Sequence, residues 1–179
     1  MKPIIICIVG HSGSGKSMIA EALEQYCDIP MIRSYTDRLP RTPDETSHTF
    51  LSKEEFNLLD KNDMIAHTQF GEHRYACLHK DVSPVCSYVL DPTGLIYLKD
   101  NFSDRYDIYS FLIERPVEKR IEAVGADRVA RDDGKFFLPP KYYDFVITND
   151  HDRKIKVLAN VEYHVWSILQ SASPHLMTK

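Results

Sequence analysis

Several features that define other classes of protein are missing from this chain of 179 residues. Its four cysteines, Cys7, Cys27, Cys77 and Cys86, include no C-x-x-C pair, which argues against a zinc site or disulfide framework and favours reduced thiols. No stretch approaches the roughly 20 apolar residues of a membrane span, and the apolar run at residues 3–9 is too short for a signal peptide. The net charge of −4 includes no run of like charges, which argues against general affinity for nucleic acid or anionic membrane. We therefore expect a cytoplasmic protein that binds neither nucleic acid nor membrane.

The order of apolar segments predicts an α/β fold with a mostly parallel sheet. Residues 4–9 (IIICIV) form a continuous β-branched run, which is typical of a strand buried on both faces of such a sheet. Residues 16–26 and 152–169 have apolar side chains at helical spacing, and Ser52 with Glu55 forms a capping box that begins another helix. Further short apolar runs predict strands at residues 30–33, 75–78, 85–90, 108–113 and 143–147. Strands that alternate with helices favour helical layers on both faces of the sheet.

Polar segments separate these elements. Residues 34–47 contain two prolines and several charges and are predicted to form a loop or an irregular flap. Residues 91–94 (DPTG) are predicted to form a turn after a strand. Residues 117–137 carry so many charged side chains that we expect them to lie outside the core.

Residues 10–17 (GHSGSGKS) match the phosphate-loop pattern G-x-x-x-x-G-K-[ST] without a gap. The motif follows a predicted buried strand and opens a helix, where backbone N–H groups and the positive end of the helix can bind phosphate oxygens. We expect Lys16 to reach the β- and γ-phosphates of ATP as a catalytic residue and Ser17 to bind Mg²⁺. The residues expected to bind ATP are Gly10, Ser12, Gly13, Ser14, Gly15, Lys16, Ser17 and Met18.

The phosphate loop alone does not identify a reaction, because kinases, GTPases, motor ATPases and transporters all use it. The sequence contains no N-K-x-D motif of the kind that reads guanine in GTPases, and 179 residues is short for a motor or transporter module.

Four further segments resemble landmarks of guanylate kinases. Residues 34–41 (SYTDRLPR) resemble the S-x-T-T-R-x-P-R segment of that family, and residues 50–56 (FLSKEEF) are similar to its F-V-S-x-E-E-F. Tyr75 lies where the family has its Y-G-x motif, and residues 143–150 (YDFVITND) are similar to Y-D-x-V-I-V-N-D. Together with the phosphate loop, these segments follow the family's order and cover most of the chain, which therefore resembles the guanylate kinase-like family.

The resemblance implies one domain over residues 1–179 with the three-layer fold of P-loop NTPases and a mostly parallel central sheet. It implies a core at about residues 1–33 and 80–179, a small acceptor-binding flap at about residues 34–79 and a short lid at about residues 117–137. The activity that it implies is transfer of a phosphoryl group from Mg²⁺·ATP to a nucleoside monophosphate.

The resemblance also implies which residues bind the acceptor. Ser34, Arg38, Arg41 and Tyr75 match residues that grip the acceptor phosphate in the family. Two guanidinium groups suit a dianionic phosphate because each offers a planar fork of donors. Thr93 is a further candidate for contact with the substrate. Without the resemblance, a pair of arginines in a solvated loop would be an ordinary surface feature.

The expected lid offers three arginines that could stabilise negative charge on the transferred phosphoryl group: Arg120, Arg128 and Arg131. Arg128 aligns best with the family's arginine just after the lid, while each of the three could also be an ordinary charge on a helix face. Asp91 ends a predicted strand at the edge of the sheet where ligands gather, so it is a candidate for binding Mg²⁺ or its waters. The alternative is a turn-forming aspartate before Pro92.

The chain departs from guanylate kinases where that family reads guanine. His48 replaces a tyrosine, Ala66 replaces the glutamate that accepts hydrogen bonds from guanine, and Cys77 replaces a serine or threonine. The D-x-D-x-x-G segment becomes residues 91–94, without its second aspartate. We therefore expect an acceptor other than plain GMP, such as a different or modified (deoxy)nucleotide.

Two alternatives remain open at this stage. One is a kinase of a phosphosugar, such as ribose bisphosphate, on the same fold. The other is a non-catalytic binding module, a class in which the phosphate loop is typically eroded, whereas here it is intact. The sequence is compatible with a monomer or a homodimer.

Overall fold

The computed structural model describes residues 2–132, 138–150 and 154–172. Residues 133–137 of the expected lid and residues 152–153 of the expected last helix lie outside the described residues.

The central sheet consists of five parallel strands in the order β2-β7-β1-β8-β9. Four of them are close to the apolar runs predicted from the sequence, and the fifth, β2, is a two-residue strand within residues 30–33. In chain order the strands are β1 (Ile4–Val9), β2 (Met31–Ile32), β7 (Val85–Val89), β8 (Asp107–Glu114) and β9 (Phe145–Thr148). The predicted mostly parallel α/β fold is therefore confirmed.

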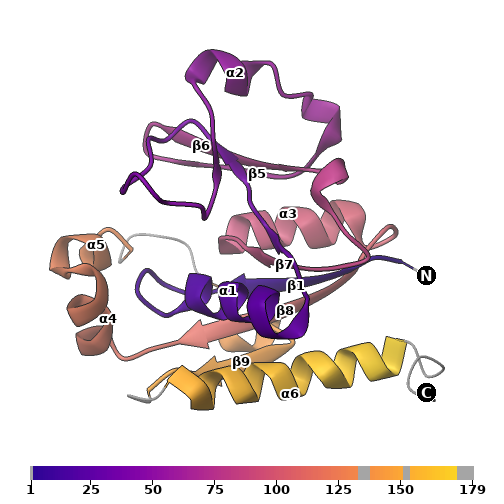
Figure 1. The fold of residues 1–179 in the computed structure, drawn as a ribbon, viewed down its shortest axis with the longest axis vertical. Coiled ribbons are helices and arrows are strands. Elements are labelled where there is room, and N and C mark those ends of the chain that lie inside the picture. The colour runs from indigo at the N-terminus through magenta and orange to yellow at the C-terminus, as the bar shows by residue number, and fades with distance from the viewer. Residues whose placement is uncertain (1, 133–137, 151–153, 173–179) are drawn as a thin grey trace.

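Helices cover both faces of this sheet, as Figure 1 shows. The first face packs on α1 (Lys16–Cys27) and α6 (Lys154–Ala172), whose inward side chains join Ile4, Ile6 and Ile8 of β1 in one buried cluster. The opposite face packs on α3 (Pro92–Phe102), whose Leu95 and Leu98 join the intervening residues of β1 in a second cluster. Because side chains alternate along a strand, the unbroken apolar run of β1 serves both layers at once.

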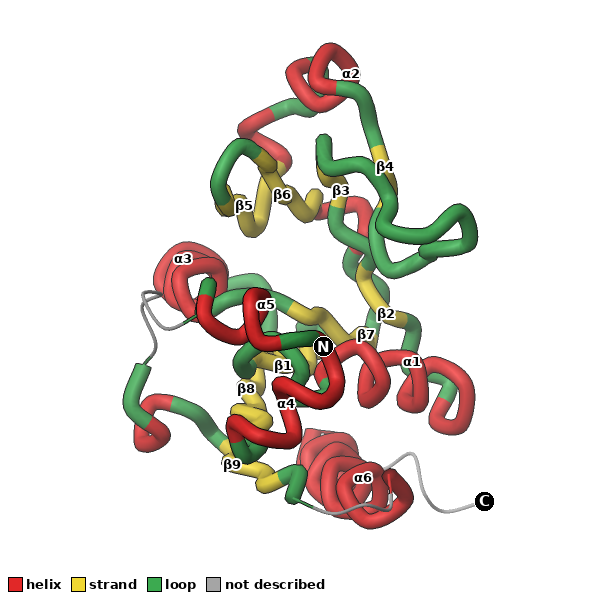
Figure 2. Tube along the Cα trace, turned by 90° about the vertical axis from the view of Figure 1, so that its left-hand side faces the viewer, coloured by secondary structure: helices red, strands yellow, loops and turns green. Residues whose placement is uncertain are grey.

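A second, four-stranded sheet lies beyond α3, in the order β4-β3-β6-β5 (Figure 2). We call it the flap sheet. Its strands are β3 (Tyr35–Thr36), β4 (Thr49–Phe50), β5 (Met64–Phe70) and β6 (His73–Leu78), and the last two form an antiparallel hairpin. Only β6 was predicted, because β5 (MIAHTQF) lacks both a long apolar run and a strict alternation. The predicted capping box is present, since the Ser52 and Glu55 side chains and backbone amides bond reciprocally at the start of α2 (Lys53–Asn57).

The flap sheet packs on α3. Ile65, Ala66 and Cys77 belong to the same buried cluster as Leu95 and Leu98. Short 3-10 helices lie at either end of the β5–β6 hairpin (Lys61–Asp63 and His79–Asp81), and a third precedes β9 (Pro140–Tyr142).

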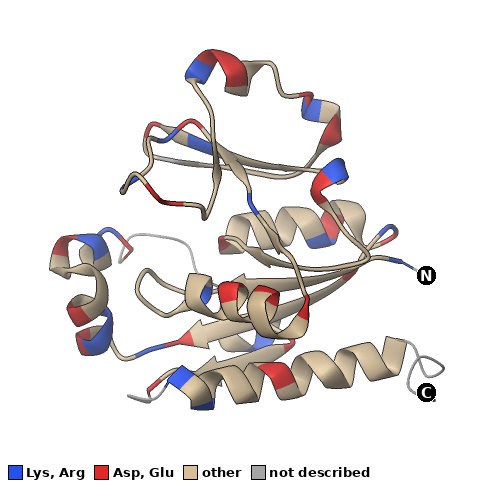
Figure 3. Cartoon of the chain, viewed as in Figure 1, with Lys and Arg blue, Asp and Glu red and all other residues tan. Residues whose placement is uncertain are grey.

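Two short helices form an arm between β8 and β9, here called the lid helices: α4 (Val117–Val124) and α5 (Ala126–Ala130). Acidic and basic residues are interspersed along both (Figure 3), as the sequence indicated. The expectation that this segment lies wholly outside the core is wrong, however, because Arg120, Val129 and Asp132 are buried. The reason is that the helices pack directly on the phosphate loop, as described below.

The turn predicted at residues 91–94 is instead the first turn of α3. The Asp91 side chain accepts hydrogen bonds from the amides of Thr93 and Gly94, and Pro92 occupies the first helical position. Proline and aspartate are common both in turns and at helix starts, so residues 91–94 alone do not distinguish the two. None of the helices within the described ranges is both long and apolar enough to cross a membrane.

Candidate active site

The phosphate-loop motif lies where β1 ends and α1 begins, and its glycines permit unusually close packing. Gly13 has φ +79°, and a Cβ there would lie 3.0 Å from the carbonyl oxygen of Arg120 in α4. A Cβ on Gly10 would lie 2.5 Å from the carbonyl oxygen of Ile113. Gly10 has φ +157°, so both positions need glycine for backbone conformation as well as for space.

Neighbouring elements hold the carbonyl groups of the loop. The Asn149 side chain, just after β9, donates from Nδ2 to the Ser14 carbonyl oxygen at 2.8 Å. Arg115, just after β8, donates from Nη1 to the Gly13 carbonyl oxygen at 2.9 Å. Because these carbonyls have partners outside the loop, the loop conformation is fixed from two neighbouring strands. Sequence reasoning missed Arg115, which belongs to none of the motifs.

Lys16 and Ser17, at the start of α1, line a large cleft beside the loop. Lys16 donates from Nζ to the carbonyl oxygen of His11 at 2.9 Å, so its ammonium group lies over the loop. On the other side of the loop, the backbone N–H of Ser12 donates to Oδ2 of Asp132 at 2.5 Å. Asp132, which follows α5, is 3% exposed and was not among the residues selected from the sequence.

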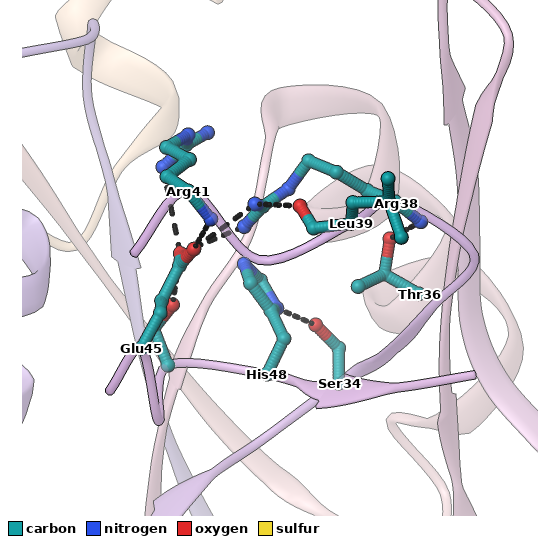
Figure 4. Close-up of polar contacts among 8 residues, drawn as sticks. Ser34, Thr36, Arg38, Leu39, Arg41, Glu45 and His48 are labelled. Carbon is teal, nitrogen blue, oxygen red and sulfur yellow. Dashed lines mark hydrogen bonds and ion pairs between the residues drawn. The ribbon is translucent and has the colours of Figure 1, made fainter. Parts of the chain in front are cut away.

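The two predicted acceptor arginines meet at one carboxylate, Glu45 (Figure 4). Arg38 forms a two-pronged ion pair with it, with Nη2 to Oε1 at 2.8 Å and Nη1 to Oε2 at 3.0 Å. The backbone N–H of Arg41 donates to the same carboxylate at 2.6 Å, and its guanidinium lies 3.7 Å from Oε1. These contacts, the Arg38 side chain first, hold the pKa of Glu45 well below its usual range. Glu45 was not predicted as a site residue either, although it is only four residues beyond Arg41.

Arg38 and Arg41 differ in exposure. The Arg38 side chain is 9% exposed and lies over the Phe50 ring, whereas the Arg41 side chain is 52% exposed. Burial, and then the positive charges of Arg128 and Arg38, lower the pKa of Arg41. Arg41 and Arg128 line the same cleft, so the flap and a lid helix both bring positive charge to it.

His48 stands at the position where the guanylate kinase pattern has tyrosine. Its Nδ1 lies 2.9 Å from the Ser34 hydroxyl oxygen, and its ring contacts the Tyr75 ring edge-on. Burial, and then the charge of Arg38, lower the pKa of His48 to about 4. The imidazole is therefore neutral near pH 7 and acts as a hydrogen-bonding partner of Ser34 rather than as a third cation.

One cleft, with a volume of about 910 Å³, joins these groups. Most of the predicted site residues line it: Gly10, Ser12, Lys16, Ser17, Ser34, Arg38, Arg41, Tyr75, Asp91, Thr93, Arg128 and Arg131. Gly13, Gly15 and Met18 line an adjoining hollow on the other side of the loop, and Ser14 is buried beneath it. Arg120 lines neither, because α4 packs against the loop and buries it to 8% exposure.

The donor set at the sheet edge suits a hard cation. Ser17 and Asp91 both line the cleft, and both offer oxygen, which Mg²⁺ prefers. Both helix-capping hydrogen bonds of Asp91 are accepted by Oδ1, and Oδ2 takes part in neither of them. Within the described ranges, no group of three or more His, Cys, Asp or Glu side chains is arranged to hold a metal ion. Any Mg²⁺ here would therefore depend on phosphate oxygens and water as well as on the protein.

Unlike His48, the other two side chains that depart from the guanine-reading pattern are buried and lack a strong hydrogen-bonding group. Ala66 is 2% exposed and Cys77 is fully buried, and burial raises the pKa of the Cys77 thiol well above its usual range. Ala66 lines the cleft and Cys77 does not, while Thr68, Gln69 and Tyr88 contribute hydroxyl and amide groups to its lining.

The parallel five-stranded sheet, the glycine-rich loop between β1 and α1 and the helices on both faces together define a P-loop NTPase-like α/β fold. Among solved structures, the chain is similar to the guanylate kinase from Anaplasma phagocytophilum, with 19% sequence identity and a TM-score of 0.67 over 99% of this chain and 88% of that one. It is also similar to TT1252 from Thermus thermophilus, with 18% identity and a TM-score of 0.52 over 94% of this chain and 99% of that one. No protein-family model and no curated protein matches the sequence. The likeness thus establishes a guanylate kinase-like fold, at an identity too low to carry an activity.

Proposed function

We propose that this protein is a kinase that transfers the γ-phosphoryl group of Mg²⁺·ATP to a small phosphorylated acceptor, most simply a (deoxy)nucleoside monophosphate. The observation that carries the proposal is the single cleft that contains both a phosphate loop and a pair of arginines. A donor triphosphate and an acceptor phosphate are both anions, so a phosphotransferase needs two anion sites facing one space.

The proposed roles follow from position. The loop amides and Lys16 would bind the triphosphate. Ser17 and Asp91 would hold the Mg²⁺, which would supply positive charge to offset the negative charge of the phosphates. Ser34, Arg38, Arg41 and Tyr75 would bind the acceptor phosphate, and Thr93 would contact the remainder of the acceptor. This scheme needs no covalent intermediate on the protein.

The three lid arginines are not equivalent in this proposal. Arg128 and Arg131 line the cleft, and Arg128 is near enough to Arg41 to lower its pKa. These two are therefore the better candidates for stabilising charge on the transferred group. Arg120 is buried behind the loop, with Nε and Nη1 unpaired among the described residues. It would serve the reaction only if the lid helices rearranged.

The apolar packing at Ala66 and Cys77 favours an acceptor other than plain GMP. A site that reads a base edge gains specificity because its own buried polar groups go unpaired with the wrong base. A buried methyl group and a buried thiol provide no such penalty. The alternatives are a modified or different nucleotide and a phosphosugar such as ribose bisphosphate.

A screen of acceptors tests the proposal. ATP labelled in its γ-phosphate is incubated with Mg²⁺, the protein and each common ribo- and deoxynucleoside monophosphate, with ribose bisphosphate in parallel. Transfer of label to one acceptor class supports the proposal and identifies that class. GMP as the preferred acceptor with a high kcat/KM would refute the altered specificity. Tight ATP binding without transfer to any acceptor would instead favour a non-catalytic binding module.

A further inference from the structure

The carboxylate of Asp132 lies on the phosphate loop itself. Its Oδ2 accepts a hydrogen bond from the backbone N–H of Ser12 at 2.5 Å, and Asp132 lines the same cleft as Lys16 and Ser17. A short hydrogen bond from a neutral amide to an ionised acceptor is of the stronger kind in proteins. The amide it occupies belongs to the loop that the proposed function assigns to the triphosphate.

This contact is supported by packing on both sides. Asp132 is 3% exposed, and its own backbone N–H donates to the carbonyl oxygen of Val129, a residue that is also 3% exposed. Across the loop, the backbone of Arg120 in α4 approaches Gly13 so closely that a Cβ there would have no room. The packing of both lid helices therefore holds the Asp132 carboxylate in place against the loop. Little side-chain entropy is lost when the contact forms.

A carboxylate and a phosphate make the same demand on the loop. Both are anionic oxygen acceptors, and one amide hydrogen cannot bond fully to both. A triphosphate in the loop would also bring further negative charge within a few ångströms of Asp132, in a site where burial weakens the screening by water. The two anions are thus mutually exclusive at this amide.

We propose that Asp132 is an internal competitor for the triphosphate, which keeps the lid helices on the phosphate loop until nucleotide displaces it. This inference rests on the proposed function only in that the chain must bind a triphosphate. Its consequence is that the protein binds ATP more weakly than its loop allows, and that binding is coupled to movement of the lid helices.

Two charge-matched variants test the proposal. Asp132→Asn removes the negative charge at the loop, whereas Asp127→Asn removes the same charge from an exposed position on α5. ATP affinity is measured by calorimetry with Mg²⁺ and without acceptor, and again with inorganic tripolyphosphate as a probe of the phosphates alone. We expect Asp132→Asn to bind both ligands about 10- to 100-fold more tightly than the wild type, as removal of a competing charge-assisted hydrogen bond implies. Asp127→Asn should stay within about 2-fold of the wild type, because an exposed charge is well screened.

The unmodified protein provides a second test, which holds even where the variant does not fold. By NMR, the Ser12 amide proton and the Asp132 side-chain carboxyl carbon should both change resonance when ATP saturates the chain. A carboxyl resonance that stays fixed at saturation would overturn the proposal.

The outcomes separate the two proposals. If ATP binds the wild type and Asp132→Asn equally well, or binds the variant more weakly, the internal competitor is refuted and the proposed kinase stands. If neither the wild type nor either variant binds ATP, the proposed function itself is refuted and this inference with it.

Discussion

The two regions of the cleft that we propose to bind anions are built in different ways: the donor side, at the phosphate loop, and the acceptor side, at Arg38 and Arg41. The phosphate loop offers backbone N–H groups, and its conformation depends on glycines and on partners as distant as Asn149. The acceptor side offers the side chains of Arg38 and Arg41, which are organised by Glu45 within the same short segment. Each region also holds a carboxylate. Glu45 accepts from Nη1 and Nη2 of Arg38 and from the backbone N–H of Arg41, whereas Asp132 accepts from the backbone N–H of Ser12 in the phosphate loop. We propose that Glu45 positions cationic groups for an anion, whereas Asp132 occupies the place of an anion.

The largest effect should come from removing the cation on the donor side. Lys16→Ala should lower turnover of the best acceptor by about 1,000-fold or more, because the ammonium group would stabilise charge on the β- and γ-phosphates. Lys154→Ala, an exposed lysine on α6, is the matched control. Steady-state kinetics with circular dichroism separate a loss of turnover from a loss of fold. If Lys16→Ala kept its turnover, the donor side would not be catalytic, and it would no longer differ in role from the acceptor side.

A smaller effect, on the free energy of unfolding, should follow from filling the space between the phosphate loop and the lid helices. Gly13→Ala should destabilise the protein by about 2–3 kcal/mol, since φ is +79° and the new Cβ would press on the Arg120 carbonyl. Gly71→Ala is a control with φ +59° and no atom within 4 Å of the added Cβ, so it should show only the backbone cost of about 1 kcal/mol. Denaturant unfolding measures both. Equal losses in the two variants would mean that the lid helices do not pack on the loop as described.

On the acceptor side, His48 should give a pH dependence to stability. Its pKa of about 4 in the folded chain lies below the ordinary value of 6.5, so between these values the unfolded chain binds a proton that the folded chain does not. Stability should therefore fall as the pH is lowered from 6.5 to 4, by about 2–3 kcal/mol from this residue alone. His48→Asn keeps a partner for Ser34 but cannot ionise, so its stability should decline less over the same range. Parallel curves for the wild type and His48→Asn, with the exposed His67→Asn as reference, would contradict this account.

The smallest effect sharpens the contrast between the two carboxylates. Glu45→Gln should raise KM for the acceptor about 10-fold and leave kcat within about 3-fold, because the arginines lose their alignment while the donor side is untouched. Glu54→Gln, an exposed glutamate in the first turn of α2, is the control. A lower acceptor KM in Glu45→Gln would mean that Glu45 competes with the acceptor phosphate, as we propose for Asp132 at the loop.

The sequence predicted the parts of the site that are local. The phosphate-loop motif lies within eight consecutive residues, and β1 is a continuous β-branched run, so both were predicted without tertiary information. The acceptor arginines, Ser34 and Tyr75 came from the resemblance to guanylate kinases, and the structure brings them to the same cleft as the loop.

What the sequence did not reveal depends on contacts between distant segments. Asp132 contacts Ser12 across 120 positions, and nothing in its neighbours distinguishes it from other charged residues of the lid helices. β5 is a strand because it pairs with β6 and packs on α3, although its own residues alternate poorly. The start of α3 was predicted as a turn, since Asp91 and Pro92 are common in turns as well as at helix starts.

The position of α3 between the two sheets has a further consequence for proteolysis and unfolding. Leu95 and Leu98 share one buried cluster with Cys7 of the central sheet and with Ile65 and Ala66 of the flap sheet. The flap has only a small buried cluster of its own, made of Phe56, Met64, Ala76 and Leu78. Its other buried apolar side chains belong to the cluster shared with α3, so cleavage of the chain at the borders of the flap would expose apolar surface on both products. Limited proteolysis should yield no stable flap fragment, and the two sheets should melt in one cooperative transition.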